Sequence, residues 1–164
     1  LLEHYGGTWI DSTVYLTEPL PDTILNSDFF AVRNSLLLID NPVLYPAWFL
    51  HAKKGNKTIR EIRNVAFSYW LKNEHVIEYL LPNLIITLVV KSNPKVEKAI
   101  PYMNSDYSEY LVKVLADDYS EEKWNWIKKL TGIHKLTYKL DADIKHGHNF
   151  YDYLITSSDE KNTK

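Results

Sequence analysis

The stretch HYGGTWIDST, residues 4–13, determines how the fold begins. It opens on the last turn of a helix, and Gly6 or Gly7 supplies the left-handed backbone conformation that commonly follows a helix end. β-Branched and aromatic residues then predict a strand over 8–16, which the prolines of TEPLPD stop. Asp11 therefore lies at a sheet edge, where α/β proteins usually keep their sites. A cap on a local turn is the alternative for Asp11.

The composition indicates one folded domain. The chain has 164 residues, and 45% hydrophobic residues supply a packed core. A net charge of −2 gives no cationic field, so we exclude nucleic acid as the main partner. The absence of cysteine excludes disulfides and thiolate metal sites, and it suits a reducing compartment such as the cytoplasm. The longest apolar run, at 79–90, is too short to span a bilayer and contains Pro82.

Strands and helices alternate along the rest of the chain. Two β-like runs, 28–32 and 35–39, are expected to pair as a hairpin. Apolar spacing and capping signals predict helices over 58–72, 74–90 with a kink at Pro82, 108–116 and 120–130, and a final strand over 134–140. The pattern predicts an α/β domain over 1–156, followed by a disordered polar tail at 157–164.

The opening of the chain, LLEHYGGTWIDSTVYLTEPLP, resembles the core of the capsular polysaccharide synthesis protein family. These bacterial sugar transferases are related to glycosyltransferase family 32 and carry a DXD motif. In that family a Tyr-Gly-Gly turn ends a helix, and the next strand carries a Trp-x-Asp-x-Thr pattern, which here is Trp9, Asp11 and Thr13. The resemblance continues in order through DFFAV, AWFLHAKKGN, SYWLK, EYLLPNLIITLV, IPYM and IHKLTYK.

The resemblance implies a fold as well as a family. We expect the C-terminal part of a GT-A-like nucleotide-diphospho-sugar transferase fold, helix-rich after the strand that carries the motif. The first strands of such a fold, which bind much of the nucleotide, are expected to lie outside this sequence. On that expectation the 164-residue chain is a fragment that need not be active alone.

The same resemblance implies a site for the donor diphosphate. Asp11 is implied to be catalytic, by helping to hold a Mn²⁺ or Mg²⁺ ion that stabilises the leaving diphosphate. Thr13 stands where the motif has a second acid, which leaves the need for metal open. Its hydroxyl suits a phosphate, a sugar hydroxyl or a metal-bound water, and a simple strand role is the alternative. Gly6, Gly7 and Trp9 are expected to contribute to the same cofactor-binding site.

Four further side chains complete the expected site. His134 is implied as a second metal ligand, with a surface or hydrogen-bonded histidine as the alternative. Lys135 beside it suits neutralisation of a diphosphate. Trp48 is expected to stack on a sugar of the acceptor, although core packing is the alternative, and Asn56 suits binding of sugar hydroxyls.

Two weaker clusters remain. His146 and His148 have a spacing that suits a metal on a strand, and a solvated loop is the alternative. Lys53 and Lys54 suit a solvated surface, or contact with an anionic glycan or a membrane.

The sequence predicts a nucleotide-sugar-dependent glycosyltransferase that acts on a glycan acceptor in capsular or surface polysaccharide synthesis. Residues 44–90 are expected to contribute to acceptor selection. A non-catalytic carbohydrate-binding or scaffold relative is the first alternative, and a helical interaction module over 58–130 is the second. The composition makes the cytoplasm the default location, the resemblance implies peripheral association with the inner face of a bacterial membrane, and the oligomeric state stays open.

Overall fold

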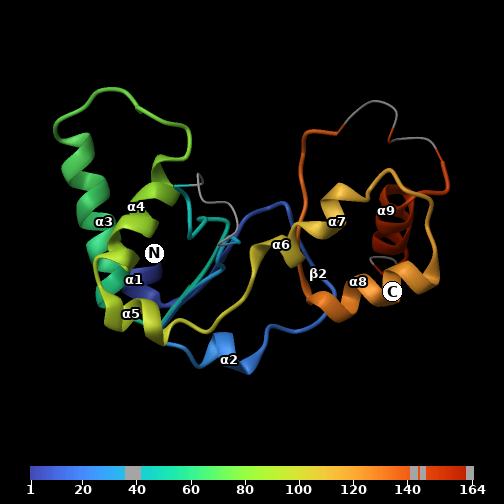
Figure 1. The fold of residues 1–164 in the computed structure, drawn as a ribbon, viewed down its shortest axis with the longest axis horizontal. Coiled ribbons are helices and arrows are strands. Elements are labelled where there is room, and N and C mark those ends of the chain that lie inside the picture. The colour runs from blue at the N-terminus through green and yellow to red at the C-terminus, as the bar shows by residue number, and fades with distance from the viewer. Residues whose placement is uncertain (36–41, 141–143, 145–146, 162–164) are drawn as a thin grey trace. The chain divides into compact units, whose positions relative to one another are not determined.

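The computed structural model describes residues 1–35, 42–140, 144 and 147–161, and it is a mixed α/β protein, which confirms the expected class (Figure 1). The chain forms two compact units. The first unit comprises Leu1–Ser12 and Leu20–Ser105, and the second comprises Thr13–Pro19 and Asp106–Lys164. The chain therefore crosses from one unit to the other directly after the Trp-x-Asp motif.

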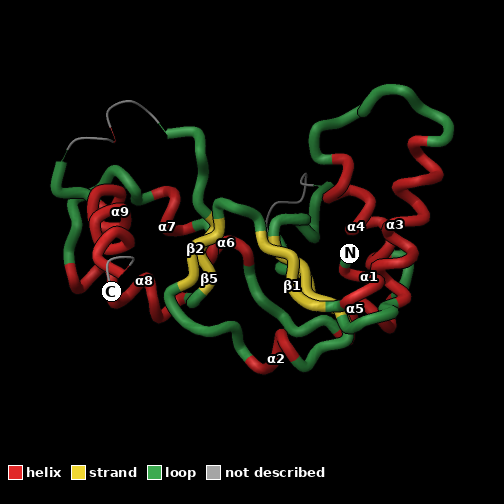
Figure 2. Tube along the Cα trace, turned by 180° about the vertical axis from the view of Figure 1, so that it is seen from behind, coloured by secondary structure: helices red, strands yellow, loops and turns green. Residues whose placement is uncertain are grey.

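A three-stranded antiparallel sheet is the centre of the first unit (Figure 2). Its strands are β1 (Gly7–Ile10), β4 (Phe49–Ala52) and β3 (Phe29–Ala31), in that order. β4 is buried along its whole length because it pairs with a strand on each side. β3 confirms the strand expected at 28–32, but it pairs with β4. Its expected hairpin partner at 35–39 falls mostly outside the described residues.

Five helices accompany this sheet in the described part of the first unit: α1 (Leu2–Tyr5), α2 (Asp22–Leu25), α3 (Lys57–Trp70), α4 (Leu81–Lys91) and α5 (Pro94–Ala99). α3 confirms the amphipathic helix expected at 58–72. The kinked helix expected from residue 74 is wrong, because α4 begins only at Leu81. Pro82 lies in the first turn of α4, where its missing N–H costs no hydrogen bond, so it starts the helix instead of bending it.

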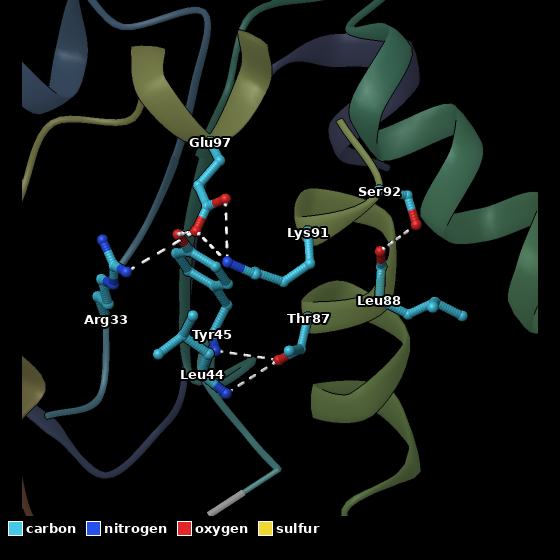
Figure 3. Close-up of polar contacts among 8 residues, drawn as sticks. All are labelled: Arg33, Leu44, Tyr45, Thr87, Leu88, Lys91, Ser92 and Glu97. Atoms are coloured by element: carbon cyan, nitrogen blue, oxygen red, sulfur yellow. Dashed lines mark hydrogen bonds and ion pairs between the residues drawn. The ribbon is translucent and has the colours of Figure 1, made fainter. Parts of the chain in front are cut away.

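A polar cluster joins α4 and α5 to the segments that flank β3 and β4 (Figure 3). The carboxylate of Glu97 accepts from Lys91 Nζ at 2.9 Å and from the Tyr45 hydroxyl at 3.4 Å, and it lies 3.7 Å from an Arg33 nitrogen. The hydroxyl of Thr87 accepts from the N–H of Tyr45 and of the residue before it, each at 3.1 Å. Burial raises the pKa of Tyr45 to about 12, so this hydroxyl stays protonated and remains a donor.

The second unit contains a two-stranded antiparallel sheet, β2 (Val14–Leu16) and β5 (Ile133–Lys135). Its helices among the described residues are α7 (Tyr110–Lys113), α8 (Glu121–Leu130) and α9 (Phe150–Lys161), and α6 (Ser105–Ser108) begins at the boundary with the first unit. α8 confirms its prediction, with the Ser120 hydroxyl as its N-cap. The single helix expected at 108–116 is instead divided between α6 and α7. α9 extends into the segment expected to be disordered, of which 162–164 lie outside the described residues.

The strand expected over 8–16 is wrong as a single element. β1 ends at Ile10 and β2 begins at Val14, and the two strands belong to different sheets. A turn at 12–13 separates them. Asp, Ser and Thr favour such breaks, because their side chains hydrogen-bond the local backbone in competition with a strand ladder.

The helices do not form a module of their own. Residues 58–130, proposed above as a helical interaction module, are divided between the two units, and α3 packs onto the sheet through Ile59. That alternative is therefore wrong. In the part of the chain that the structure describes, no helix has the length and apolar character needed to cross a bilayer.

Gly6 offers a direct test of this packing. Its φ is +71°, and a Cβ added there would lie 2.7 Å from the backbone nitrogen of Lys54. Gly7 also has a positive φ, but an added Cβ would meet nothing within 4 Å. We expect Gly6→Ala to lower the free energy of unfolding by about 3 kcal/mol or more, and Gly7→Ala to lower it by about 1–2 kcal/mol. Urea unfolding of both variants measures the difference, and equal losses would show that the contact with Lys54 is unimportant.

Candidate functional site

Asp11 follows β1 directly and is held beside the central strand. Its backbone N–H donates to the carbonyl oxygen of Trp48 at 2.9 Å, which continues the pairing of β1 with β4 by one residue. Side chains alternate along an extended chain, so Asp11 lies on the same face as Trp9. Trp9 is 51% exposed, and Asp11 is half-buried. A carboxylate and a large aromatic ring thus share one accessible face of the sheet edge.

Gly6 and Gly7 differ in the space beside their backbone. The backbone of residues 52–54 packs closely against Gly6, so the chain itself accounts for the need for glycine there. The space beside Gly7 is open within 4 Å. Of the two, only Gly7 leaves room for a ligand at the backbone.

Thr13 and Lys135, both expected at the donor diphosphate, contact each other in the second unit. The ammonium of Lys135 donates to the Thr13 hydroxyl across the β2–β5 pair. The carbonyl of Thr13 accepts from the backbone N–H of Leu136 at 2.8 Å, so the backbone of this pair is fixed as well. The structure therefore brings together two of the predicted site residues, while Asp11 belongs to the first unit.

Glu109 is a candidate acid–base group that the sequence did not reveal. Burial raises the pKa of this carboxyl, the nearby charge of Asp106 raises it further, and the charges of Lys113 and Lys135 partly oppose both effects. Carboxyl groups with raised pKa values are common at catalytic sites, although buried structural groups show them too. In the sequence Glu109 falls within SEYLVKVLA, where it has the ordinary place of a charged residue on a helix.

His134 does not have the surroundings of a metal ligand. Its side chain is fully buried, a hydrogen bond of 3.2 Å joins Nε2 to the Thr17 hydroxyl, and the ring lies 6.1 Å from that of Trp124. Burial lowers the pKa of His134 to about 4, so the ring is neutral. Among the described residues no three His, Asp or Glu side chains gather to hold a metal ion. The packed position of His134 fits a core role better than the ligand role that the resemblance implied.

The two residues expected at the acceptor also have structural roles. Trp48 is only 7% exposed and packs edge-on against Phe49, so its ring faces are not available to a sugar. Asn56 caps α3, since its Oδ1 accepts from the N–H of Ile59 at 3.1 Å, and its Nδ2 donates to the carbonyl of Asp28 at 2.8 Å. Of the expected histidine pair, His148 is exposed and His146 lies outside the described residues.

The burial of His134 predicts a loss of stability in acid. The unfolded histidine has a pKa of 6.5 and the folded one about 4, so between these pH values the unfolded chain binds a proton that the folded chain excludes. We expect the free energy of unfolding to fall by about 3 kcal/mol as the pH falls through this range. Urea unfolding of the parent and of His134→Gln measures this, and the variant should lose most of the dependence.

His75, an exposed histidine, provides the control for that experiment, since His75→Gln should retain the full dependence on pH. Burial also lowers the pKa of His51, which leaves a smaller dependence in His134→Gln. An unchanged profile in His134→Gln would show that His134 titrates normally in the folded chain.

Comparison with known proteins bears directly on this site. The family model of the capsular polysaccharide synthesis protein matches residues 1–154, which include β1, the Trp-x-Asp-x-Thr pattern, the whole first unit and most of the second. No curated protein and no solved structure matches the chain. The match extends over nearly the whole sequence, and it contains every site residue discussed above. The chain therefore belongs to the capsular polysaccharide synthesis protein family.

Proposed function

We propose that the chain is a glycosyltransferase that moves a sugar from a nucleotide-diphospho-sugar donor to a glycan acceptor in capsular or surface polysaccharide synthesis. Membership of the family supports the biosynthetic role. The position of Asp11 is the observation on which the proposed reaction depends. It puts a half-buried carboxylate directly after β1, two residues after the exposed ring of Trp9.

Asp11 suits a cation that is bound mainly by substrate. Mg²⁺ usually keeps several waters and takes one or two carboxylates together with substrate phosphates, so one aspartate is sufficient on the protein side. Asp11 would hold Mg²⁺ or Mn²⁺ in this way, and the ion when bound would supply charge stabilisation for the leaving diphosphate. No role for His134 is needed. A GT-A-like arrangement of the donor site is part of the same proposal.

In the second unit, Lys135 and Thr13 offer an ammonium and a hydroxyl in contact with each other. Both groups bind phosphate oxygens well, and we propose the pair as a phosphate contact of the second unit by itself.

Thr13 also favours a second candidate function, a carbohydrate-binding or scaffold relative without catalysis. The second acid of the motif is absent, and Lys135 already occupies the threonine hydroxyl. Such a protein binds glycans without binding nucleotides. Free UDP, GDP or CMP that competes with glycan binding would therefore argue against this second function.

Replacement of Asp11 tests the proposed transfer. We expect Asp11→Asn and Asp11→Ala to lower turnover at least about 100-fold, because each removes a charge that acts at the leaving group. The matched control is Asp22→Asn, which changes an exposed carboxylate in α2 of the same unit. Release of nucleotide from a panel of donors measures turnover, and calorimetric titration of UDP, GDP and CMP with and without Mn²⁺ measures binding. Variants at Asp11 that turn over as fast as the parent would rule out its catalytic role.

A further inference from the structure

The first unit contains an apolar groove of about 1010 Å³. α1, β1, α3, α4 and the segment that joins α3 to α4 form its walls. Its floor is aliphatic, with Leu50 from β4, Ile59 and Ile62 from α3, and Ile85 from α4. All of the lining residues belong to the first unit, so the groove is a property of that unit alone. Neither Asp11 nor the Lys135–Thr13 pair lines it.

One end of the groove is cationic. Lys54, Arg60 and Arg63 line this end, near the start of α3, together with a single carboxylate from Glu3. Glu3 accepts from Arg60 Nε at 2.8 Å and pairs with Arg63 as well. The hydrogen bond from Arg60 lowers the pKa of Glu3, so this carboxylate is ionised and neutralises one of the three cations. The remaining excess of positive charge is complementary to an anionic headgroup.

The opposite end of the groove is exposed and carries many large apolar side chains, with Lys72, Glu74 and Glu78 exposed between them. We name residues 67–80, at the end of α3 and in the segment that follows, the apolar tip. Its exposed large hydrophobic side chains are Phe67, Trp70, Leu71, Val76, Ile77, Tyr79 and Leu80. Of these, Trp70, Val76 and Tyr79 also line the groove. Both views show the tip projecting beyond the body of α3 and α4 (Figures 1 and 2). The cluster exceeds the scattered apolar residues of an ordinary surface, and aromatic residues of this kind favour a membrane interface.

The distance between the two ends matches a lipid. Arg60 and Arg63 precede Trp70 on α3 by ten and seven residues, which correspond to about 15 Å and about 10 Å at a rise of 1.5 Å per residue. One leaflet of a bilayer has about 15 Å of hydrocarbon beneath its phosphates. Arg63 precedes Trp70 by two turns of α3. With its headgroup at the arginines, a lipid would have its acyl chain along α3, directed toward the apolar tip.

We propose that the groove binds one acyl chain of an anionic membrane phospholipid, with the phosphate at Lys54, Arg60 and Arg63 and the chain directed toward the inserted apolar tip. This gives the chain a specific mode of peripheral membrane association. The inference does not depend on sugar transfer, because its evidence lies in the groove and the tip.

Vesicle binding tests the proposal. Co-sedimentation with phosphatidylcholine vesicles, with and without phosphatidylglycerol, measures affinity, and lipids brominated on the acyl chain measure contact with Trp70 through quenching of its fluorescence. We expect binding to the mixed vesicles and quenching that Trp70→Phe reduces. Monomeric dihexanoyl-phosphatidylglycerol should also bind, whereas glycerol phosphate alone should not, because the apolar chain supplies most of the affinity.

Paired variants separate the two ends of the groove. Leu71→Ser with Ile77→Ser should weaken vesicle binding at least about tenfold, because both side chains are exposed and lose apolar area that the membrane would bury. Lys54→Gln with Arg63→Gln should weaken binding to the mixed vesicles roughly 25-fold, at about fivefold for each cation. Leu88→Ser and Lys98→Gln change exposed residues of the same unit outside the groove, and they should bind as the parent does.

Three results would overturn the proposal. The first is equal binding by the tip variants and the parent, and the second is equal affinity for vesicles with and without phosphatidylglycerol. The third is a dimer seen by sedimentation velocity that Leu71→Ser dissociates in the absence of any lipid affinity, because a second copy would then cover the tip.

Discussion

The pairing of β4 with strands on both of its edges is the constraint on which the first unit depends. A central strand must bury its backbone polar groups on both edges, and here β1 and β3 supply the partners. The end of β4 brings residues 52–54 against Gly6, which explains why only glycine fits there. The residue before β4, Trp48, holds the backbone of Asp11. The pairing of β4 therefore positions both the end of α1 and Asp11, the candidate catalytic carboxylate.

Two carboxylates, each shared between cations, then join the helices of this unit to one another. Glu3 ties α1 to α3 through Arg60 and Arg63, and Glu97 ties α5 to α4 through Lys91. Both side chains are partly buried, so water screens these pairs less than it screens a fully exposed pair. Around Glu3 two arginines meet one carboxylate, and the excess charge remains at the end of an apolar groove. The same arrangement thus holds α1 in place and gives the groove its polarity.

The carboxylate proposed for sugar transfer and the headgroup end of the proposed lipid site lie at opposite ends of β1. Trp9 lines the groove and shares a face with Asp11, two residues further on. The cationic end of the groove lies near Lys54, beside the start of β1, whereas Asp11 lies past its end. A lipid with its phosphate at Lys54 would therefore have its headgroup at the other end of β1 from Asp11. Trp9 borders both proposed sites, so the variants that test membrane association and those that test sugar transfer leave Trp9 in place.

The sequence by itself determined the family, the α/β class, and the elements whose signals are local. The helix over 57–70 follows from apolar spacing, the start of α8 from Ser120, and the Tyr-Gly-Gly turn from the need for positive φ. The motif at Trp9 and Asp11 identified the candidate carboxylate, because a family motif consists of residues that lie close together in the sequence.

Tertiary structure decided what depends on partners distant in sequence. The stretch 8–16 has uniform strand propensity, yet its halves pair with β4 and β5 in different sheets. His134 and Trp48 have side chains that suit a site, and only packing shows that both are buried. Asn56 was expected at sugar hydroxyls, but the end of α3 and the carbonyl of Asp28 use both of its polar groups. Local propensity carries no information on which long-range contact will bury a side chain, and burial decided the role of each of these residues.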